Sequence, residues 1–128
     1  MSVDSPVHIG TCGFSYPEWI EAGIYPPGTK SAQMLGLYRL LFPVVELNYT
    51  WYQMIRAETV ERLLVCGGSN LFFCAKLTRT MTHEIGDTWE KDVETFRGGI
   101  RPLADAGRLA AVLLQFPYSF AYTPESRK

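Results

Sequence analysis

The stretch Pro43-Val-Val-Glu-Leu-Asn48 decides the fold, because it places a short apolar strand directly after a helical pattern. In the preceding segment, apolar residues recur at helical spacing from Leu35 to Phe42. We expect Ser31 to cap this helix and Pro43 to end it. A helix followed at once by a buried strand is the repeating unit of a parallel α/β sheet.

The same alternation extends over the whole chain of 128 residues. Short apolar runs predict four buried strands, over residues 7–11, 44–48, 71–77 and 110–116. A second helix is expected over 58–66, ended by Gly67-Gly68, and a third over 93–103, weakened by Gly98-Gly99 and followed by Gly107. The order is (βα)₃β, which predicts one α/β unit over 1–128 with parallel strands and a frayed tail at 121–128.

Composition excludes several classes of protein. The chain is 47% hydrophobic and 20% charged, which is typical of a globular domain rather than a disordered or collagenous one. Twelve Lys and Arg against thirteen Asp and Glu leave a formal charge of −1, so no overall field would hold the chain on nucleic acid. No apolar run approaches the roughly 20 residues that span a bilayer. We therefore expect a cytoplasmic protein without a membrane partner.

Cysteine spacing and glycine motifs give no sign of a cofactor. Cys12, Cys66 and Cys74 lie far apart and form no CxxC pair, so neither a disulfide framework nor a zinc site is expected. Cys74 lies in an apolar run and is expected to be a small core residue, whereas Cys12 is the better candidate for an accessible thiol. The sequence 10–13, GTCG, is neither GxGxxG nor a P-loop. We expect no metal and no cofactor.

Polar residues interrupt the apolar runs at the carboxyl ends of three predicted strands. Glu46 and Asn48 have the same parity and so lie on one side of their strand, while Lys76 and Gln115 close the third and fourth strands. Functional groups of parallel α/β folds gather at this edge of the sheet. Two interpretations stay open: a buried Glu46–Lys76 pair that only fills space, or a site in which the lysine holds a substrate anion or exchanges a proton.

The loops after the strands contain one histidine of interest and many aromatic residues. His83 follows the third predicted strand and could act as a general acid or base, or could simply be a loop histidine bonded to the backbone. His8, at the opposite edge, is assigned no role. Aromatic loop residues could stack on sugars or nucleobases, or could merely cover the mouth of a barrel; they are Tyr16, Trp19, Tyr25, Tyr49, Trp51 and Tyr52.

Several separated motifs in a fixed order resemble the YecE-like family, domain of unknown function 72. They are Ile9-Gly-Thr-Cys-Gly-Phe-Ser-Tyr-Pro-Glu-Trp19, Val45-Glu-Leu-Asn-Tyr-Thr-Trp-Tyr52, Phe73-Cys-Ala-Lys76, Thr82-His83 and Leu113-Leu-Gln-Phe-Pro-Tyr-Ser-Phe120. The resemblance covers residues 7 to about 120. It implies a TIM-type (βα)₈ barrel, here only its N-terminal half with four parallel strands and three main helices, because a whole barrel takes about 250 residues.

The resemblance also implies a polar pocket at the carboxyl mouth of that barrel. Its residues would be Tyr16, Trp19, Glu46, Asn48, Thr50, Tyr52, Lys76, Thr82, His83 and Gln115. Three positions depart from the family pattern: Trp51 stands where Phe is usual, the stretch 53–55 lacks a common proline, and Tyr118 replaces a second proline.

Two classes of function are compatible with these residues, and the sequence leaves open whether the protein is an enzyme. The first is an enzyme or ligand-binding domain for a small polar or sugar-like molecule, with Glu46, Lys76 and His83 as acid, base or anion-holding groups. The alternative is a nucleic-acid-binding or endonuclease-like barrel that uses the aromatic loops together with Lys76 and Arg79. In either case we expect the open sheet edges to need the second half of the barrel or a homodimer partner.

Overall fold

Four parallel strands form one sheet in the order β1-β2-β3-β4 in the computed structural model, which describes residues 7–127. The strands are β1 (Gly10–Cys12), β2 (Val44–Leu47), β3 (Phe72–Lys76) and β4 (Leu109–Leu113). Each is paired in parallel with its sequence neighbour. The predicted α/β class and the four strands are confirmed, although every strand is shorter than its apolar run.

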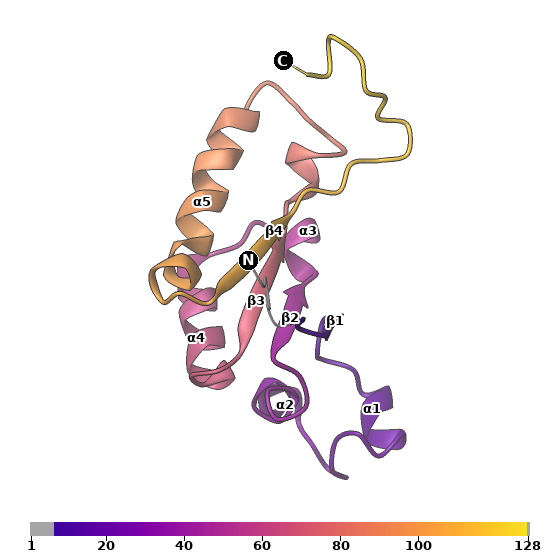
Figure 1. Ribbon diagram of the computed structural model, residues 1–128, viewed down its shortest axis with the longest axis vertical. Helices are drawn as coiled ribbons and strands as arrows, with labels where there is room; N and C mark the ends of the chain where they lie inside the picture. Colours follow the sequence, from indigo (N-terminus) through magenta and orange to yellow (C-terminus); the bar gives the residue numbers. More distant parts are fainter. Residues whose placement is uncertain (1–6, 128) are drawn as a thin grey trace, which may run out of the picture.

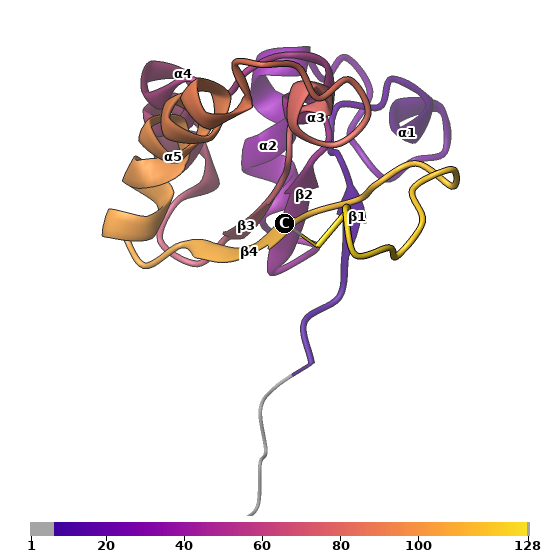
Figure 2. The ribbon, with the colours of Figure 1, turned by 90° about the horizontal axis from the view of Figure 1, so that it is seen from above.

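The helices all lie on one side of this sheet, as Figures 1 and 2 show. They are α1 (Glu18–Glu21), α2 (Ser31–Tyr38), α3 (Tyr49–Tyr52), α4 (Ala57–Gly67) and α5 (Trp89–Asp105), with a 3-10 helix η1 (Arg79–Met81). Within residues 7–127, no helix covers the other side of the sheet, which we call the open face. This one-sided arrangement is that of a partial TIM-type barrel, in which helices lie outside and the bare face lies inside.

The hydrophobic core lies between the sheet and the helices. Val45 and Leu47 of β2, and Phe73 and Ala75 of β3, are fully buried there, while the residues between them face the open side and are half-buried. The strands therefore alternate between core and open face, as side chains of a strand must. The helices and loops contribute Leu35, Tyr38, Ile55, Val60, Phe96 and Leu103 to the same core.

Two buried polar side chains tie the strands to the helix layer. The Tyr38 hydroxyl accepts a hydrogen bond from the Thr11 backbone N–H at 2.8 Å and donates one to the Val44 carbonyl oxygen at 2.8 Å. The Arg108 guanidinium donates to the Gly68 carbonyl oxygen at 2.9 Å and also to that of Leu71. Burial lowers the pKa of Arg108. Both residues satisfy backbone groups where strands begin.

The start of α2 corrects one sequence prediction. Ser31 is the first helical residue rather than the cap, which is Lys30. The Lys30 backbone N–H donates to the side-chain oxygen of Gln33 at 2.9 Å, so Gln33 satisfies the backbone of the cap residue, which is a different donor from those that a serine cap would satisfy. The predicted end of α4 is confirmed, since Gly68 follows it with a φ of +63°, a conformation that favours glycine.

Helix α5 runs through the Gly98-Gly99 pair without interruption, and Pro102 also lies within it. Gly99 is buried, and a Cβ atom there would lie 2.3 Å from the carbonyl oxygen of Ile55. Around Gly98 nothing lies within 4 Å of such an atom. Gly99 therefore lets α5 approach the segment that leads into α4, whereas Gly98 has no such role.

Residues beyond the sheet complete the description. After β4 the chain continues past the carboxyl end of the sheet without further strand or helix up to residue 127, and Figure 1 shows this segment extending away from β4. The Thr123 backbone N–H donates to the Ser126 hydroxyl at 2.8 Å and forms a local turn. Lys128 lies outside the described residues. None of the helices within 7–127 is long and apolar enough to cross a membrane.

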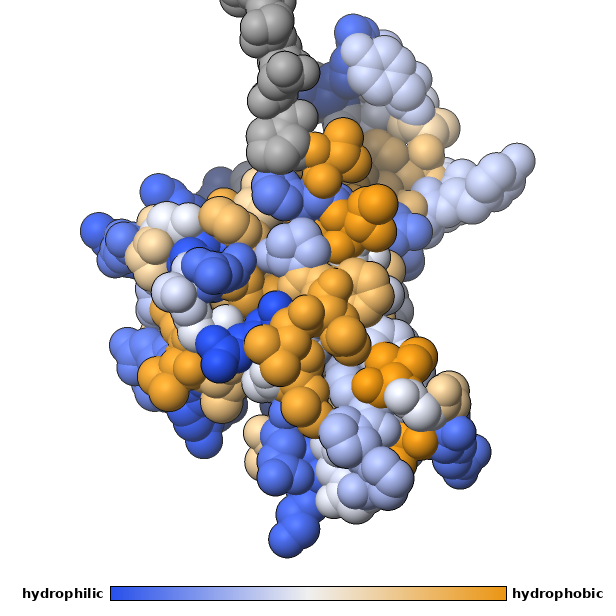
Figure 3. All heavy atoms as spheres, turned by 60° about the horizontal axis from the view of Figure 1, so that its bottom comes forward, coloured by the Kyte–Doolittle hydropathy of each residue, from blue (hydrophilic) through white to orange (hydrophobic). Residues whose placement is uncertain are grey.

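Apolar side chains are also exposed at the amino-terminal ends of the strands. Figure 3, in which the bottom of Figure 1 comes forward, shows hydrophobic residues gathered in the middle of the view. Ile9, just before β1, is 70% exposed, and Leu40, which follows α2, is 74% exposed.

Candidate functional site

One row of side chains crosses the open face at the middle of the sheet. The strand register aligns Cys12 with Glu46, Glu46 with Cys74, and Cys74 with Ala111. Lys76 lies two residues beyond Cys74, beside Leu113, and therefore on the same face. The open face thus brings a carboxylate, an ammonium group and two thiols from three neighbouring strands together.

Glu46 and Lys76 do not neutralise one another. Within residues 7–127, ion pairs of 4.0 Å or less form only between Arg79 and Glu84, Arg97 and Glu94, and Arg101 and Asp105. The Lys76 ammonium instead lies over the Trp51 ring, 5.8 Å from its centroid, where the ring's negative face attracts a cation. Of the two interpretations of these residues, the buried Glu46–Lys76 pair is therefore absent.

A hollow of about 210 Å³ lies at the carboxyl ends of β1 and β2. Glu46, Asn48, Tyr16 and Tyr49 contribute to its lining. The Tyr49 hydroxyl is buried without a hydrogen-bond partner, and burial raises the pKa of Tyr49. This hydroxyl is inaccessible to water, so the polar groups that the hollow offers come from Glu46 and Asn48. At about 30 Å³ per water molecule, the hollow has room for a small molecule rather than a large one.

The Cys12 thiol, also at this hollow, responds to both charged groups. Its partial desolvation raises the pKa of Cys12, and the Glu46 carboxylate beside it raises this pKa further, while Lys76 lowers it. On the next strand, burial and the Glu46 charge raise the pKa of Cys74. Neither thiol is in a disulfide. Because the pKa of each is raised, both are neutral neighbours of Glu46.

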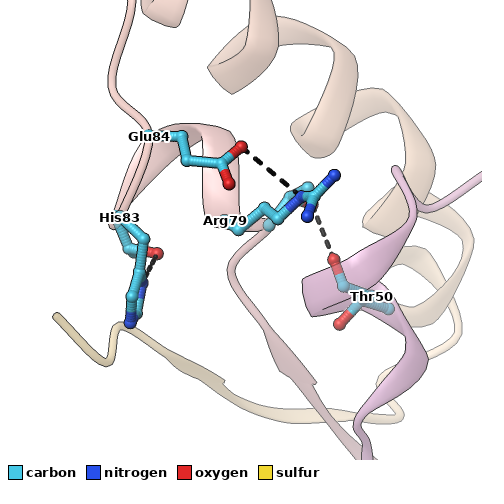
Figure 4. A network of polar contacts seen from close by, with 6 residues as sticks. Thr50, Arg79, His83 and Glu84 are labelled. Atoms are coloured by element: carbon cyan, nitrogen blue, oxygen red, sulfur yellow. Dashed lines mark hydrogen bonds and ion pairs between the residues drawn. The ribbon is translucent and has the colours of Figure 1, made fainter. Parts of the chain in front are cut away.

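His83 contacts the aromatic ring of Trp51, and neither residue lines the hollow. Its ring meets the Trp51 ring edge-on, with centroids 5.3 Å apart. The buried Thr82 hydroxyl lies 2.8 Å from His83 Nδ1 and so fixes the orientation of the imidazole (Figure 4). Lys76 and His83 therefore share one aromatic neighbour, Trp51.

Thr50 fixes the position of α3 relative to the ends of two strands. Its side chain is fully buried, and its hydroxyl lies 2.8 Å from the Leu47 carbonyl oxygen and 2.5 Å from that of Lys76. The Thr50 carbonyl oxygen in turn accepts a hydrogen bond from the Thr78 hydroxyl at 2.7 Å, which is the contact drawn to Thr50 in Figure 4. Thr50 thus fastens α3 to the ends of β2 and β3, with no polar atom left over for a ligand.

Three other residues expected at the pocket lie elsewhere. Trp19 packs into an aromatic cluster on the helix side, with its ring centroid 5.4 Å from that of Tyr25 and 6.2 Å from that of Tyr38. Tyr52 is 72% exposed and touches Trp51 by its edge. Gln115 is exposed two residues past the end of β4.

The structure adds two residues that the sequence pattern named only among the aromatic loop residues, for stacking on a ligand or for covering the mouth. Tyr49 contributes to the lining of the hollow while its hydroxyl is buried, and the Trp51 ring lies under the Lys76 ammonium. Both belong to the four-residue helix α3, whose single turn leaves no periodicity to read. In the sequence, only the polar Asn48 directly before them indicated that this segment lies at the site.

A larger hollow of about 610 Å³ lies on the helix side, between the beginning of α4 and the middle of α5. Its lining includes Arg56, Thr59, Arg62 and Gly99, but none of the strand-end groups. We therefore place the candidate site at the smaller hollow, where polar groups from separate strands meet. Within residues 7–127, no three His, Cys, Asp or Glu side chains are grouped so that they could hold a metal ion.

Comparison with known proteins gives consistent matches. The family model "Protein of unknown function DUF72" matches residues 8–128. The UPF0759 protein YunF of Bacillus subtilis (strain 168) is 31% identical over 116 residues, which are 87% of this chain and 40% of that protein. A DUF72 family crystal structure from Thermotoga maritima is 31% identical, with a TM-score of 0.76 over 93% of this chain and 47% of that one.

A DUF72 family structure from Enterococcus faecalis is 23% identical and matches in fold, with a TM-score of 0.77 over 94% of this chain and 43% of that one. The chain therefore spans less than half the length of the relatives that it matches. With a family model that covers nearly all of its residues, this chain belongs to the DUF72 family of proteins of unknown function.

Proposed function

We propose that the chain binds a small, polar, hydroxyl-rich molecule of the sugar type at the carboxyl ends of β1 and β2. The observation that supports this most is the hollow of about 210 Å³ that Glu46, Asn48 and Tyr49 line. The Glu46 carboxylate, which forms no ion pair within residues 7–127, accepts hydrogen bonds from hydroxyl groups, and the Asn48 amide both donates and accepts them. A polyol or sugar offers both donors and acceptors, so it suits the side chains of Glu46 and Asn48.

We infer that Lys76 and His83, which do not line the hollow but both contact Trp51, add a capacity for proton exchange. The Lys76 ammonium faces the open side beside the row that contains Glu46, where it can hold an anionic substituent of the ligand. Thr82 engages Nδ1 of His83, so Nε2 is the ring nitrogen that would exchange a proton with a bound molecule. A reaction at this site would therefore be a proton transfer on the bound molecule, with Glu46, Lys76 and His83 as the exchanging groups.

The nucleic-acid alternative draws less support. Arg79, which would contact phosphate, has Glu84 at 3.6 Å, so its charge is partly neutralised. Tyr25 is fully buried and Trp19 packs against Tyr38, which removes two rings from the stacking surface. Of the two cations that this alternative uses, only Lys76 is without an acidic partner, and one cation is too little for binding through the phosphate backbone.

Calorimetric titration of the 128-residue chain with a panel of sugars, sugar phosphates and polyols tests the proposal. For any molecule that binds, Glu46→Gln and Lys76→Met should each weaken binding by about tenfold or more, because each removes a charge-assisted hydrogen bond. The matched controls Glu61→Gln and Lys91→Met change exposed helix residues and should leave binding unchanged. Equal affinity in all four variants would contradict the assignment.

A further inference from the structure

We propose that Trp51 is a positioning residue that holds the Lys76 ammonium apart from Glu46 and leaves both charges unpaired on the open face. This role concerns the proposed ligand site and takes its purpose from the proposed function. The placement of the ammonium group is a property of the chain alone, so it can be measured without a ligand.

Glu46 and Lys76 lie within reach of one another. Glu46 is level with Cys74 in the strand register, and Lys76 follows Cys74 by two residues on the same face of β3. With neighbouring strands about 4.8 Å apart and a rise of about 3.3 Å per residue, the Cα atoms of Glu46 and Lys76 are about 8 Å apart. The extended side chains of a lysine and a glutamate together exceed this distance. The backbone geometry therefore permits an ion pair.

The Lys76 ammonium has an aromatic partner instead. Its Nζ atom lies over the Trp51 ring, 5.8 Å from the centroid, and forms no ion pair of 4.0 Å or less with residues 7–127. Tryptophan is the aromatic side chain that attracts a cation most strongly. At half-buried positions such as these, a cation–π contact and an ion pair contribute comparable free energies. The place of the indole can therefore decide which contact the lysine makes.

Several contacts fix the Trp51 ring in that place. The Tyr52 ring meets it edge-on with centroids 4.7 Å apart, and the His83 ring does so at 5.3 Å. The hydroxyl of the preceding residue, Thr50, lies 2.8 Å from the Leu47 carbonyl oxygen and fastens α3 to the end of β2. Because the indole is held by these neighbours, it gives the ammonium group a defined position.

The separation leaves two opposite charges for a bound molecule. A Glu46–Lys76 pair would engage the carboxylate, which lines the hollow at the ends of β1 and β2, with a partner from the chain itself. Held apart, the carboxylate accepts hydrogen bonds from hydroxyl groups, and the ammonium group attracts an anionic substituent. Trp51 thus acts through Lys76 and needs no contact with the molecule.

The Cys12 thiol reports the position of the ammonium group without a ligand. It is aligned with Glu46, and the charge of Lys76 lowers its pKa. In Trp51→Leu we expect Lys76 to turn towards Glu46, bring its charge nearer the thiol and speed alkylation by about twofold to tenfold. Trp51→Phe keeps an aromatic face and should stay within about twofold of the parent. The control Trp89→Leu makes the same change at an exposed residue of α5 and should not alter the rate.

Two further measurements separate this role from a loss of structure. In a Lys76→Met background, Trp51→Leu should leave the alkylation rate of Cys12 unchanged, whereas a loosened fold would speed it in both backgrounds. In the parent chain, the ring current of the indole should shift the Lys76 Hε protons upfield in the NMR spectrum, which requires no variant to fold. Ordinary shifts for these protons would overturn the proposal.

Ligand binding then tests the purpose of the arrangement. For any sugar, sugar phosphate or polyol that binds, Trp51→Leu should weaken binding about tenfold or more, as Lys76→Met does, and the double variant no further. An unchanged Cys12 rate in Trp51→Leu, or the same acceleration in the Lys76→Met background, would overturn the role of Trp51 even if a ligand binds. The expected Cys12 rates without binding of any molecule would support this role and contradict the proposed function.

Discussion

Thr50 shows how a single buried hydroxyl can position a site without belonging to it. Because its oxygen lies between two carbonyl groups and is fully buried, Thr50→Val should lower the free energy of unfolding by about 1–3 kcal/mol. The control is Thr95→Val, which removes a bond of 2.9 Å to the Lys91 carbonyl oxygen on the exposed side of α5. That change should cost less than about 0.5 kcal/mol. Urea unfolding measures both, and equal costs would contradict the structural role.

Residue parity predicted which face each strand residue occupies, but not which partners it meets. Glu46 and Lys76 lie on the open face because alternation along a strand is fixed by backbone geometry. Trp19 and Thr50 owe their places to contacts with residues far along the chain, Tyr38 and Lys76, which no local pattern encodes. The candidate site was thus predictable where it rests on strand geometry, and unpredictable where it rests on tertiary packing.

At the scale of elements, we expect alanine to have opposite effects on stability at the two adjacent glycines of α5. Gly99→Ala should destabilise the protein by about 1–3 kcal/mol, because its Cβ would collide with the Ile55 carbonyl oxygen. Gly98→Ala meets open space and should stabilise it by about 0.5–1 kcal/mol through better helix propensity. Thermal unfolding of the two variants compares them directly. Stabilisation by both would mean that α5 does not approach the segment before α4 as closely as described.

The long helices and the strands could be predicted from the sequence because their apolar residues recur at regular spacing. Helices α4 and α5 span several turns, and four apolar runs stand out as strands. The structure also contains α1 and α3, each of four residues, in the segments that follow the first and second predicted strands, where no helix was expected. A single helical turn has no periodicity, and its stability comes from packing, so such elements escape prediction.

At the scale of the whole molecule, the central claim is that Glu46 and Lys76 face one shared space on the open side of the sheet. Cys12 lies beside Glu46 in the register and reports the local charge through its own ionisation. A carboxylate disfavours the thiolate and an ammonium group favours it, so the two residues push the pKa of Cys12 in opposite directions. The alkylation rate of Cys12 therefore depends on the charges of Glu46, on β2, and Lys76, on β3.

The most direct test is the rate of Cys12 alkylation near pH 8, resolved from that of Cys66 by mass spectrometry. Glu46→Gln should lower the pKa of Cys12 and speed alkylation, while Lys76→Met should raise this pKa and slow it. Each effect should be about twofold to tenfold, since one pKa unit changes the thiolate fraction about tenfold. Cys66, on α4, should react at the same rate in every variant. Unchanged alkylation of Cys12 in both variants, or a change of the same sign in both, would contradict the shared space on the open face.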